Sequence, residues 1–179
     1  MQKRFRILIA LCGLALALFP TLPISGQTGK KTPEFRLLIP VIQVDVPIIT
    51  ARRTRTSWSV ARLGTKYAGH LEGMRLPGKG GNIGIAAHVE LSATKPGPFI
   101  DLDQLVVGDV IIVRYGDVDH VYEVSSTFTV KPTDIEFVAA TPYEVLTLIT
   151  CESDGSGTAR GRYALRRIVR ALPQGSQPE

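Results

Sequence analysis

The stretch TLITCESDGSG, residues 147–157, predicts a strand that ends on a cysteine at the edge of a loop. Apolar and β-branched residues run up to Thr150, which favours a β-strand, and the polar, glycine-containing residues after Cys151 favour a loop. A cysteine buried only for structural reasons is expected inside such an apolar run. One at the end of the strand meets both solvent and a substrate, so Cys151 is a candidate reactive residue.

Short apolar segments recur along the chain, with turn residues between them. Residues 42–48 alternate apolar with polar or proline side chains, the period of a half-buried strand, and Pro47 puts that strand at an edge or interrupts its ladder. Phe99–Leu105 is expected to form one short helix, and the glycine-rich Gly64–Gly81 an ordered loop. Many short strands with little helix predict a mostly β fold, a closed or nearly closed β-barrel. The other expected strands are Arg36–Ile39, Asn82–Ala87, Val110–Val113, Val121–Val130, Val145–Thr150 and Tyr163–Ala171.

Length and composition indicate one globular domain with a short appendage. The chain has 179 residues, of which 44% are hydrophobic and 21% are charged, enough apolar material for a proper core. The formal net charge is +5, but Lys3, Arg4 and Arg6 at the N-terminus contribute part of it. Several other arginines crowd into residues 160–170, too few and too local for a nucleic-acid surface. No nucleic-acid partner is expected.

The N-terminus has the pattern of a targeting segment. The basic MQKRFR, residues 1–6, precedes the uncharged apolar stretch ILIALCGLALALF, as in a signal sequence or a membrane anchor. No good cleavage site follows, which favours an uncleaved anchor and a single-pass protein of the cell membrane with its folded domain outside the cytoplasm. We expect a cytoplasmic N-terminus at 1–6, a membrane anchor or signal sequence at 7–25, a linker at 26–34, the functional domain at 35–173 and a tail at 174–179.

The two cysteines have different surroundings. Cys12 lies in the predicted membrane segment, so it cannot pair with Cys151. A single cysteine in an exported domain is either an intermolecular link or a reactive thiol, because disulfides normally form in that compartment. One cysteine and 3 scattered histidines show no metal-ligand spacing. No metal and no cofactor are expected.

Two further residues have chemistry that suits a thiol. His88 ends the predicted strand NIGIAAH, and Arg166 opens RRIVRA in the last predicted strand. Each has a plain structural alternative, because a lone histidine is commonly a hydrogen-bonded polar residue and an arginine on a terminal strand commonly faces solvent. His70 and His120 are interpreted in that structural way, the first on a loop and the second near a turn.

Taken together, TLITC, RRIVRA and NIGIAAH resemble the cysteine, arginine and histidine strands of the sortase family. The stretches RLLIPVIQVDVPI and PFIDLDQLVVGDVI resemble the first strands of a sortase barrel and its short helix with the following strand. The resemblance covers about residues 35–171 and implies a sortase-like β-barrel with short helices. It implies Cys151 as nucleophile, His88 as catalytic histidine and Arg166 as catalytic arginine. Adjacent strand residues face opposite sides, so Arg166 and Arg167 cannot both serve, and Arg160 and Arg162 in the preceding loop are weaker matches.

The resemblance implies a cysteine transpeptidase. Cys151 would attack a Thr–Gly bond in an LPxTG-like or LAxTG-like C-terminal sorting signal and form a thioester. An amine acceptor, a cell-wall peptide or a pilin lysine, would then take the acyl group. The implied partners are surface proteins that carry the signal, the amine and the membrane. The pattern fits a housekeeping-like or class D or E sortase better than a pilus-building class C enzyme, and the connection Lys131–Glu144 is where the family commonly sets its sequence preference.

Several assignments stay open at this stage. Thr150 is a candidate substrate contact or simply completes its strand, and Glu90 is a candidate to orient the imidazole of His88 or a solvated loop residue. Trp58 is interpreted as a packing residue. A cysteine peptidase remains an alternative because hydrolysis uses the same acyl-enzyme, and so does a catalytically silent sortase-like barrel that binds protein tails. A redox enzyme would need a second, resolving cysteine in the exported domain.

Overall fold

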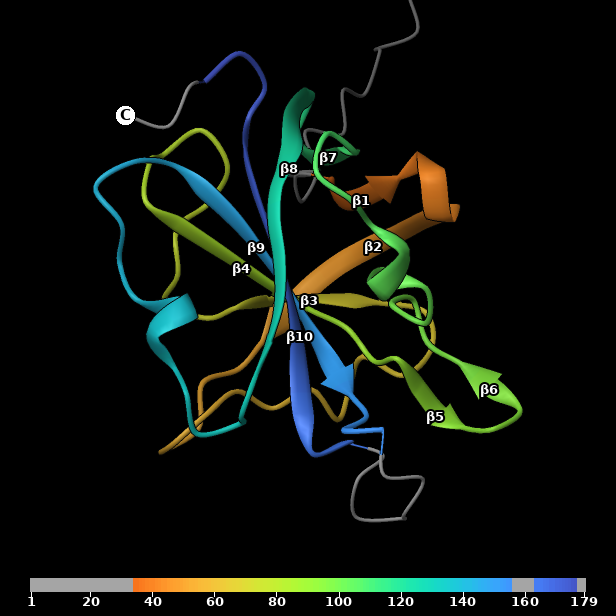
Figure 1. Ribbon diagram of the computed structural model, residues 1–179. Helices are drawn as coiled ribbons and strands as arrows, with labels where there is room; N and C mark the ends of the chain where they lie inside the picture. The colour runs from red at the N-terminus through yellow and green to blue at the C-terminus, as the bar shows by residue number, and fades with distance from the viewer. Residues whose placement is uncertain (1–33, 156–162, 177–179) are drawn as a thin grey trace, which may run out of the picture. The chain divides into compact units, whose positions relative to one another are not determined.

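Eight strands of the domain close into a β-barrel (Figure 1). The computed structural model describes residues 34–155 and 163–176. The strands follow the order β1-β2-β3-β4-β9-β10-β8-β7 around the barrel, and β5 and β6 form a separate two-stranded sheet. The mostly β, closed architecture predicted from the sequence is confirmed. The elements are β1 (Phe35–Ile39), η1 (Pro40–Ile42), β2 (Val44–Ala51), β3 (Ala68–Leu71), β4 (Asn82–Ala86), β5 (Glu90–Ser92), β6 (Lys95–Pro96), η2 (Leu102–Gln104), β7 (Val110–Tyr115), β8 (Val118–Val130), η3 (Glu136–Val138), β9 (Val145–Glu152) and β10 (Leu165–Pro173).

Two pairs of neighbouring strands are parallel, and they decide where the strand ends meet. β2 pairs with β3 and β4 pairs with β9 in parallel, while the other barrel pairs are antiparallel. Parallel strands need a crossover connection, and residues 87–144 make the one from β4 to β9. The carboxyl ends of β4 and β9 therefore lie at the same edge of the barrel. β2 pairs with β3 only from Ile48 onward. Pro47 therefore lies in the part of β2 that is paired with β1 alone.

The main core consists of alternate residues of the barrel strands. Along β9, Leu146 and Leu148 are fully buried in this core, and β4 contributes Ile83 and Ile85. Alternate residues of a strand face opposite sides of the sheet, so these side chains fill the barrel interior. Burying one such side chain contributes roughly 1.5–3 kcal/mol relative to leaving it in water.

A second, smaller apolar cluster covers the outer face of the same strands. Ala86 of β4 and Ile149 of β9 belong to it, and both lie one residue out of phase with the main core. The remaining members are Ala51, Leu71, Trp58, Val60, Met74 and Val138, several of them from the β2–β3 and β8–β9 connections. These connections therefore pack onto the outside of the barrel over β4 and β9.

Some local predictions are wrong. Gly64–Gly81 was expected to be a loop, yet it contains the buried strand β3, and His70 lies on that strand. The residues AGHL do not alternate in polarity because all four are buried, so the usual signal of a half-buried strand is missing. The helix expected at Phe99–Leu105 is only the single 3-10 turn η2, and the helical elements of residues 34–155 and 163–176 are all such turns.

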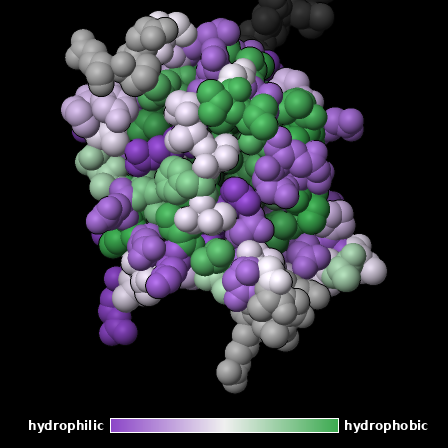
Figure 2. Space-filling view, viewed as in Figure 1, coloured by the Kyte–Doolittle hydropathy of each residue, from purple (hydrophilic) through white to green (hydrophobic). Residues whose placement is uncertain are grey.

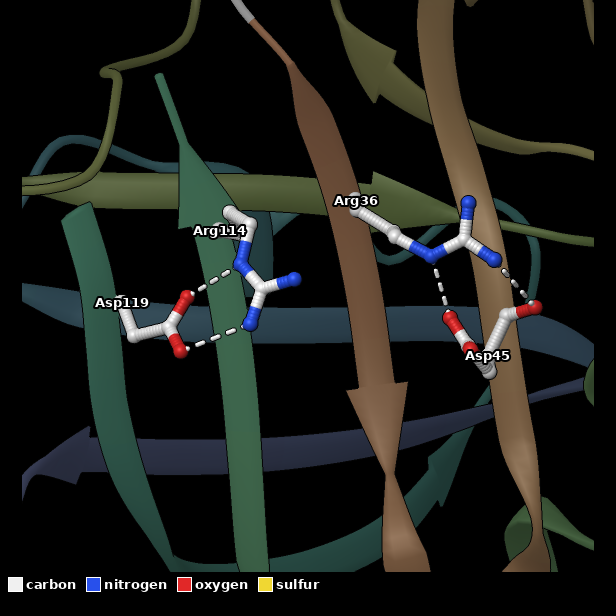
Figure 3. Close-up of polar contacts among 4 residues, drawn as sticks. All are labelled: Arg36, Asp45, Arg114 and Asp119. Carbon is white, nitrogen blue, oxygen red and sulfur yellow. Dashed lines mark hydrogen bonds and ion pairs between the residues drawn. The ribbon is translucent and has the colours of Figure 1, made fainter. Parts of the chain in front are cut away.

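Two arginine–aspartate pairs bridge the strands β8, β7, β1 and β2 (Figure 3). Arg36 and Arg114 are directly opposite each other on β1 and β7, and like charges in that position are unfavourable. Each has a carboxylate partner: Arg36 bonds Asp45, and Arg114 bonds Asp119 through two bonds of 2.6 and 2.9 Å. The hydrogen bonds from Arg114 lower the pKa of Asp119. These pairs balance the positive charge on this side of the barrel.

The predicted membrane segment, residues 7–25, lies outside the described residues, as do the predicted segment 1–6 and the loop arginines Arg160 and Arg162. In the part of the chain that the structure describes, no helix combines the length and the apolar character that a membrane crossing needs.

His70 should make the stability of the barrel depend on pH. Burial lowers the pKa of His70, and the contact of 2.9 Å between its Nε2 atom and the carbonyl oxygen of Arg75 only partly opposes this. Below about pH 6.5 the unfolded chain binds a proton that the folded chain resists, so the free energy of unfolding falls as the pH drops below that value. We expect His70→Gln, which keeps a hydrogen-bonding group and cannot titrate, to lose less stability than the wild type between pH 7.5 and pH 5.5. Urea denaturation at both pH values measures this, and equal losses in the two proteins would contradict it.

Candidate active site

The pairing of β9 with β10 places Arg166 beside Cys151. The two residues are direct partners in the antiparallel ladder, and Arg167 is paired with Thr150. Partners directly opposite each other point to the same face of a sheet. Arg166 therefore shares the outer face of the barrel with Cys151, whereas Arg167 belongs to the other face, where its Nε donates to Oε2 of Glu152 at 2.9 Å.

His88 reaches the same place from the other neighbouring strand. Ala86 is paired with Ile149 in the parallel ladder, and two bonds continue this alignment. The N–H of Ala87 donates to the carbonyl oxygen of Ile149 at 3.2 Å, and the hydroxyl of Thr150 donates to the carbonyl oxygen of Ala87 at 2.9 Å. One residue further, His88 and Cys151 line the same hollow.

The ring and the backbone of His88 are both held. The Nε2 atom lies 3.1 Å from the carbonyl oxygen of Val60, which assigns the ring hydrogen to Nε2 and leaves Nδ1 as the accepting nitrogen of the neutral imidazole. The backbone carbonyl of His88 accepts the N–H of Phe99 at 3.1 Å. Gly97 lies so close that a Cβ atom there would be 2.1 Å from this oxygen, so only glycine fits.

Cys151, His88 and Arg166 line a mostly apolar hollow of about 340 Å³. Cys151 is a free thiol with intermediate exposure. The walls come from the outer cluster and from the two connections that cover it, among them Trp58, Val60, Leu71, Ile149 and Val138. No Asp or Glu is among its described lining residues. Such a hollow suits an extended peptide with apolar side chains and brings its backbone to a thiol, an imidazole and a guanidinium.

Asn82 ties the β8–β9 connection to the barrel. Its Nδ2 donates to the carbonyl oxygens of Phe137 at 2.8 Å and Ala139 at 2.9 Å, while its Oδ1 accepts the hydroxyl of Thr147 at 2.8 Å. Arg170 adds a bond of 3.2 Å from Nη2 to the carbonyl oxygen of Phe137. Asn82 is buried, so these bonds are shielded from water. They hold the connection that forms one wall of the hollow.

Glu144 fixes the far end of that connection. It accepts the hydroxyl of Tyr122 at 2.7 Å and the backbone N–H of Gly80 at 2.9 Å. Tyr122 is fully buried in the main core, and burial together with this bond raises the pKa of its hydroxyl. The connection is thus anchored to the interior of the barrel as well as to its outer face.

The other candidates from the sequence have structural contacts. Thr150 is buried, and its hydroxyl holds β9 to the chain after β4. Oε1 of Glu90 accepts the hydroxyl of Tyr163 at 3.0 Å. His70 lies on β3 and His120 on β8, and neither lines the hollow that contains Cys151. Within the described residues, no three His, Cys, Asp or Glu side chains gather closely enough to hold a metal ion.

Trp58 and Asn82 shape the hollow, and sequence reasoning missed their part in it. Trp58 packs against the outer cluster, as its interpretation as a packing residue implies, but it also lines the hollow. Its Nε1 donates to the carbonyl oxygen of Glu72 at 2.9 Å, which holds the β2–β3 connection in place. The sequence signal that could have indicated this role is that Trp58 stands within the otherwise polar stretch 52–59. Asn82 had no local signal, because its partners are distant in the sequence.

Residues 37–174 match the sortase domain family. The chain therefore belongs to the sortase family, as its resemblance predicts, and it is a sortase-type cysteine transpeptidase. The comparison with curated proteins gives no match.

Solved sortase structures agree with this assignment. A sortase D5 transpeptidase of Clostridium perfringens is 27% identical, with 80% of this chain and 79% of that chain covered and a TM-score of 0.60. Sortase C-1 of Actinomyces oris is 30% identical, with 82% and 75% covered and a TM-score of 0.63. A lid mutant of sortase A from Corynebacterium diphtheriae is 28% identical, with 81% and 72% covered and a TM-score of 0.62. The likeness is thus to the family and not to one class of it.

Loss of the Asn82 amide should loosen the wall of the hollow without touching the reactive groups. In Asn82→Leu the carbonyl oxygen of Ala139 loses its donor and that of Phe137 keeps only the bond from Arg170, which costs about 1–3 kcal/mol of stability. We expect KM for a peptide substrate to rise while kcat changes little, and proteolysis within residues 131–144 to become faster. Thr141→Val is the matched control, because it removes a bond of 2.7 Å to Tyr143 inside the connection and leaves the tether intact. An unchanged KM in Asn82→Leu would contradict the tether.

Proposed function

We propose that this chain is a membrane-anchored sortase that cleaves the Thr–Gly bond of an LPxTG-like or LAxTG-like C-terminal sorting signal. It joins the threonine carbonyl, through a thioester on Cys151, to an amine acceptor on a cell-wall peptide or on a pilin lysine. The observation that carries this proposal is that Cys151, His88 and Arg166 line one apolar hollow. The family gives the reaction type, and the proposal is supported by a thiol, an imidazole and a guanidinium that line one hollow.

In the acylation step, Cys151 is the nucleophile and His88 the acid. A free thiol is only a few per cent ionised at neutral pH, and the thiolate is the attacking form, so a neighbouring imidazolium is useful. The thiolate attacks the threonine carbonyl carbon and the imidazolium protonates the departing glycine nitrogen. The C–N bond breaks, the Cys151 thioester forms and His88 is left neutral.

Arg166 is proposed to stabilise the negative charge on the carbonyl oxygen during that attack. Its Nη1 donates to the carbonyl oxygens of Tyr163 at 3.0 Å and Leu165 at 2.8 Å, so the guanidinium is held by the main chain just before Arg166. A guanidinium has five N–H donors, which leaves Nη2 and Nε for the substrate. A donor fixed before the reaction stabilises the developing charge without having to reorganise.

In the second step an amine attacks the thioester, and neutral His88 accepts a proton from it. The C–S bond breaks and the free enzyme returns. If water takes the place of the amine, the same intermediate is hydrolysed and the protein acts as a cysteine peptidase. The anchor at residues 7–25 would keep the domain at the membrane, where surface proteins with sorting signals emerge. Thr150 is retained as a candidate substrate contact through its place in the lining of the hollow.

The acyl-enzyme is the direct test. The chain is mixed with peptides that carry LPxTG or LAxTG, and intact mass is measured with and without an amine. We expect a mass increase equal to the peptide fragment that ends in threonine, and its loss when an amine is added. Cys151→Ala should show no adduct and the same unfolding midpoint. No adduct in the wild type with either peptide would favour a silent binding barrel or another substrate.

The two arginines of β10 should differ sharply in activity. Arg166→Ala is expected to lower kcat/KM by roughly 100-fold or more, the usual effect of losing a donor to the oxyanion. Arg167→Ala should leave kcat/KM within a few fold and reduce stability instead, because it removes the partner of Glu152. Steady-state kinetics and thermal unfolding of both variants measure this. Equal losses of activity, or the reverse order, would reject the role given to Arg166.

A further inference from the structure

The ring of His88 takes its hydrogen bond from the β2–β3 connection, residues 52–67. Its Nε2 atom lies 3.1 Å from the carbonyl oxygen of Val60, so the hydrogen of the neutral ring is on Nε2 and Nδ1 is left to exchange a proton. The same oxygen accepts the N–H of the buried Leu63 at 3.0 Å, which fixes it from the residues that follow. The place of one backbone carbonyl therefore decides which nitrogen of His88 can act as acid and base.

Val60 comes directly after a small hairpin in this connection. The N–H of Ser59 donates to the carbonyl oxygen of Arg52 at 2.8 Å. Nearer the tip, the N–H of Thr54 donates to the carbonyl oxygen of Ser57 at 2.8 Å. The connection, orange to yellow in Figure 1, leaves the barrel after β2 and returns to it at β3. Figure 2, from the same side, shows hydrophobic and hydrophilic residues interspersed on this face. The Val60 carbonyl keeps its place only if the hairpin is attached to the barrel.

Trp58 supplies that attachment. Its Nε1 donates at 2.9 Å to the carbonyl oxygen of Glu72, the residue after β3. The opposite side of the hairpin is tied to the same residue, because the N–H of Arg53 donates to Oε2 of Glu72 at 2.8 Å. Glu72 is fixed in turn by its own N–H, which donates to the carbonyl oxygen of Ala51 at 3.0 Å. Trp58 is two residues from Val60, so the indole bond holds the segment next to the carbonyl that the His88 ring contacts.

We propose that Trp58 is a positioning residue for catalysis, whose bond to Glu72 keeps the Val60 carbonyl where it orients the ring of His88. This inference rests on the proposed function. Trp58 and Val60 also line the apolar hollow. A substrate side chain that packs against the indole therefore contacts the same segment that carries the hydrogen-bond acceptor of His88. The wall of the hollow and the acid–base group are linked through one hairpin.

The experiment removes the N–H of Trp58 and keeps the shape of its side chain. 3-Benzothienylalanine, which has sulfur in place of the indole N–H, is inserted at position 58 of the full chain, and the protein is studied in detergent. We expect kcat for a sorting-signal peptide to fall by about tenfold, a fraction of what a well-placed acid–base group contributes. KM should change little, because the hollow keeps its aromatic wall.

Thr54→Val is the matched control in the same hairpin. It removes the two contacts between the Thr54 hydroxyl and the backbone of Ser57, and it leaves the bond from Trp58 to Glu72 in place. We expect kcat and KM of this variant to stay close to the wild-type values. An unchanged kcat with benzothienylalanine, or an equal fall of kcat in Thr54→Val, would overturn the role given to Trp58.

The nitrogen chemical shifts of the His88 ring give a reading that needs no substrate. They are measured by NMR in the Cys151→Ala chain at about pH 8.5, well above the pKa of an ordinary imidazole, and are assigned by their loss when His88 is also replaced by alanine. We expect the hydrogen on Nε2 when position 58 is tryptophan, and a mixture of both tautomers when it is benzothienylalanine. A hydrogen on Nδ1 in the tryptophan-containing chain, or the same tautomer in both chains, would overturn the inference.

The two measurements separate this inference from the proposed function. Tautomers that respond to position 58, in a chain that forms no acyl-enzyme with any signal peptide, would reject the proposed sorting signals and keep the positioning of His88. Acyl transfer with tautomers that do not respond would reject the role of Trp58 alone.

Discussion

The in-register parallel pairing of β4 with β9 is the constraint on which the site depends. Ala86 is paired with Ile149, and the side-chain bond from Thr150 to Ala87 extends the alignment past the end of β4. Parallel strands finish at the same edge, so the residues that follow them meet there. β10 then returns antiparallel to β9 and brings a guanidinium to the level of the thiol. Cys151, His88 and Arg166, the candidate catalytic residues, are therefore positioned by sheet hydrogen bonds, which hold them more rigidly than loops would.

β9 belongs to two apolar clusters at once. Leu146 and Leu148 fill the barrel, while Ile149 supports the hollow on the outside. A change of register by one residue would exchange these faces and move Cys151 into the interior. The two connections that cover the hollow are held mainly through backbone carbonyls, by Trp58 and by Asn82. The shape of the hollow is thus tied to the main chain.

The sequence predicts the barrel and the strand before Cys151 because those segments are apolar or alternate over several residues. It does not predict β3, since AGHL is buried throughout and lies within the glycine-rich segment Gly64–Gly81. The nearness of His88 and Arg166 to Cys151 follows from the family resemblance and not from any local pattern, because pairing between distant strands is not written in either strand alone. The same reason hides Asn82, whose bonds to the β8–β9 connection span 55 and 57 residues. The helix expected at Phe99–Leu105 fails because its apolar spacing fits a single buried turn equally well.

The crossover from β4 to β9 also orders events during synthesis. Residues 87–144 must be made before β9 can pair, and β10 follows later still. Contacts between segments so far apart in the chain form slowly, because a long loop must close first. A nascent chain that ends soon after β4 contains His88 but not Cys151. One that ends before β10 contains Cys151 but not Arg166. The domain therefore brings its three candidate catalytic groups together only when nearly all of it has been made and folded.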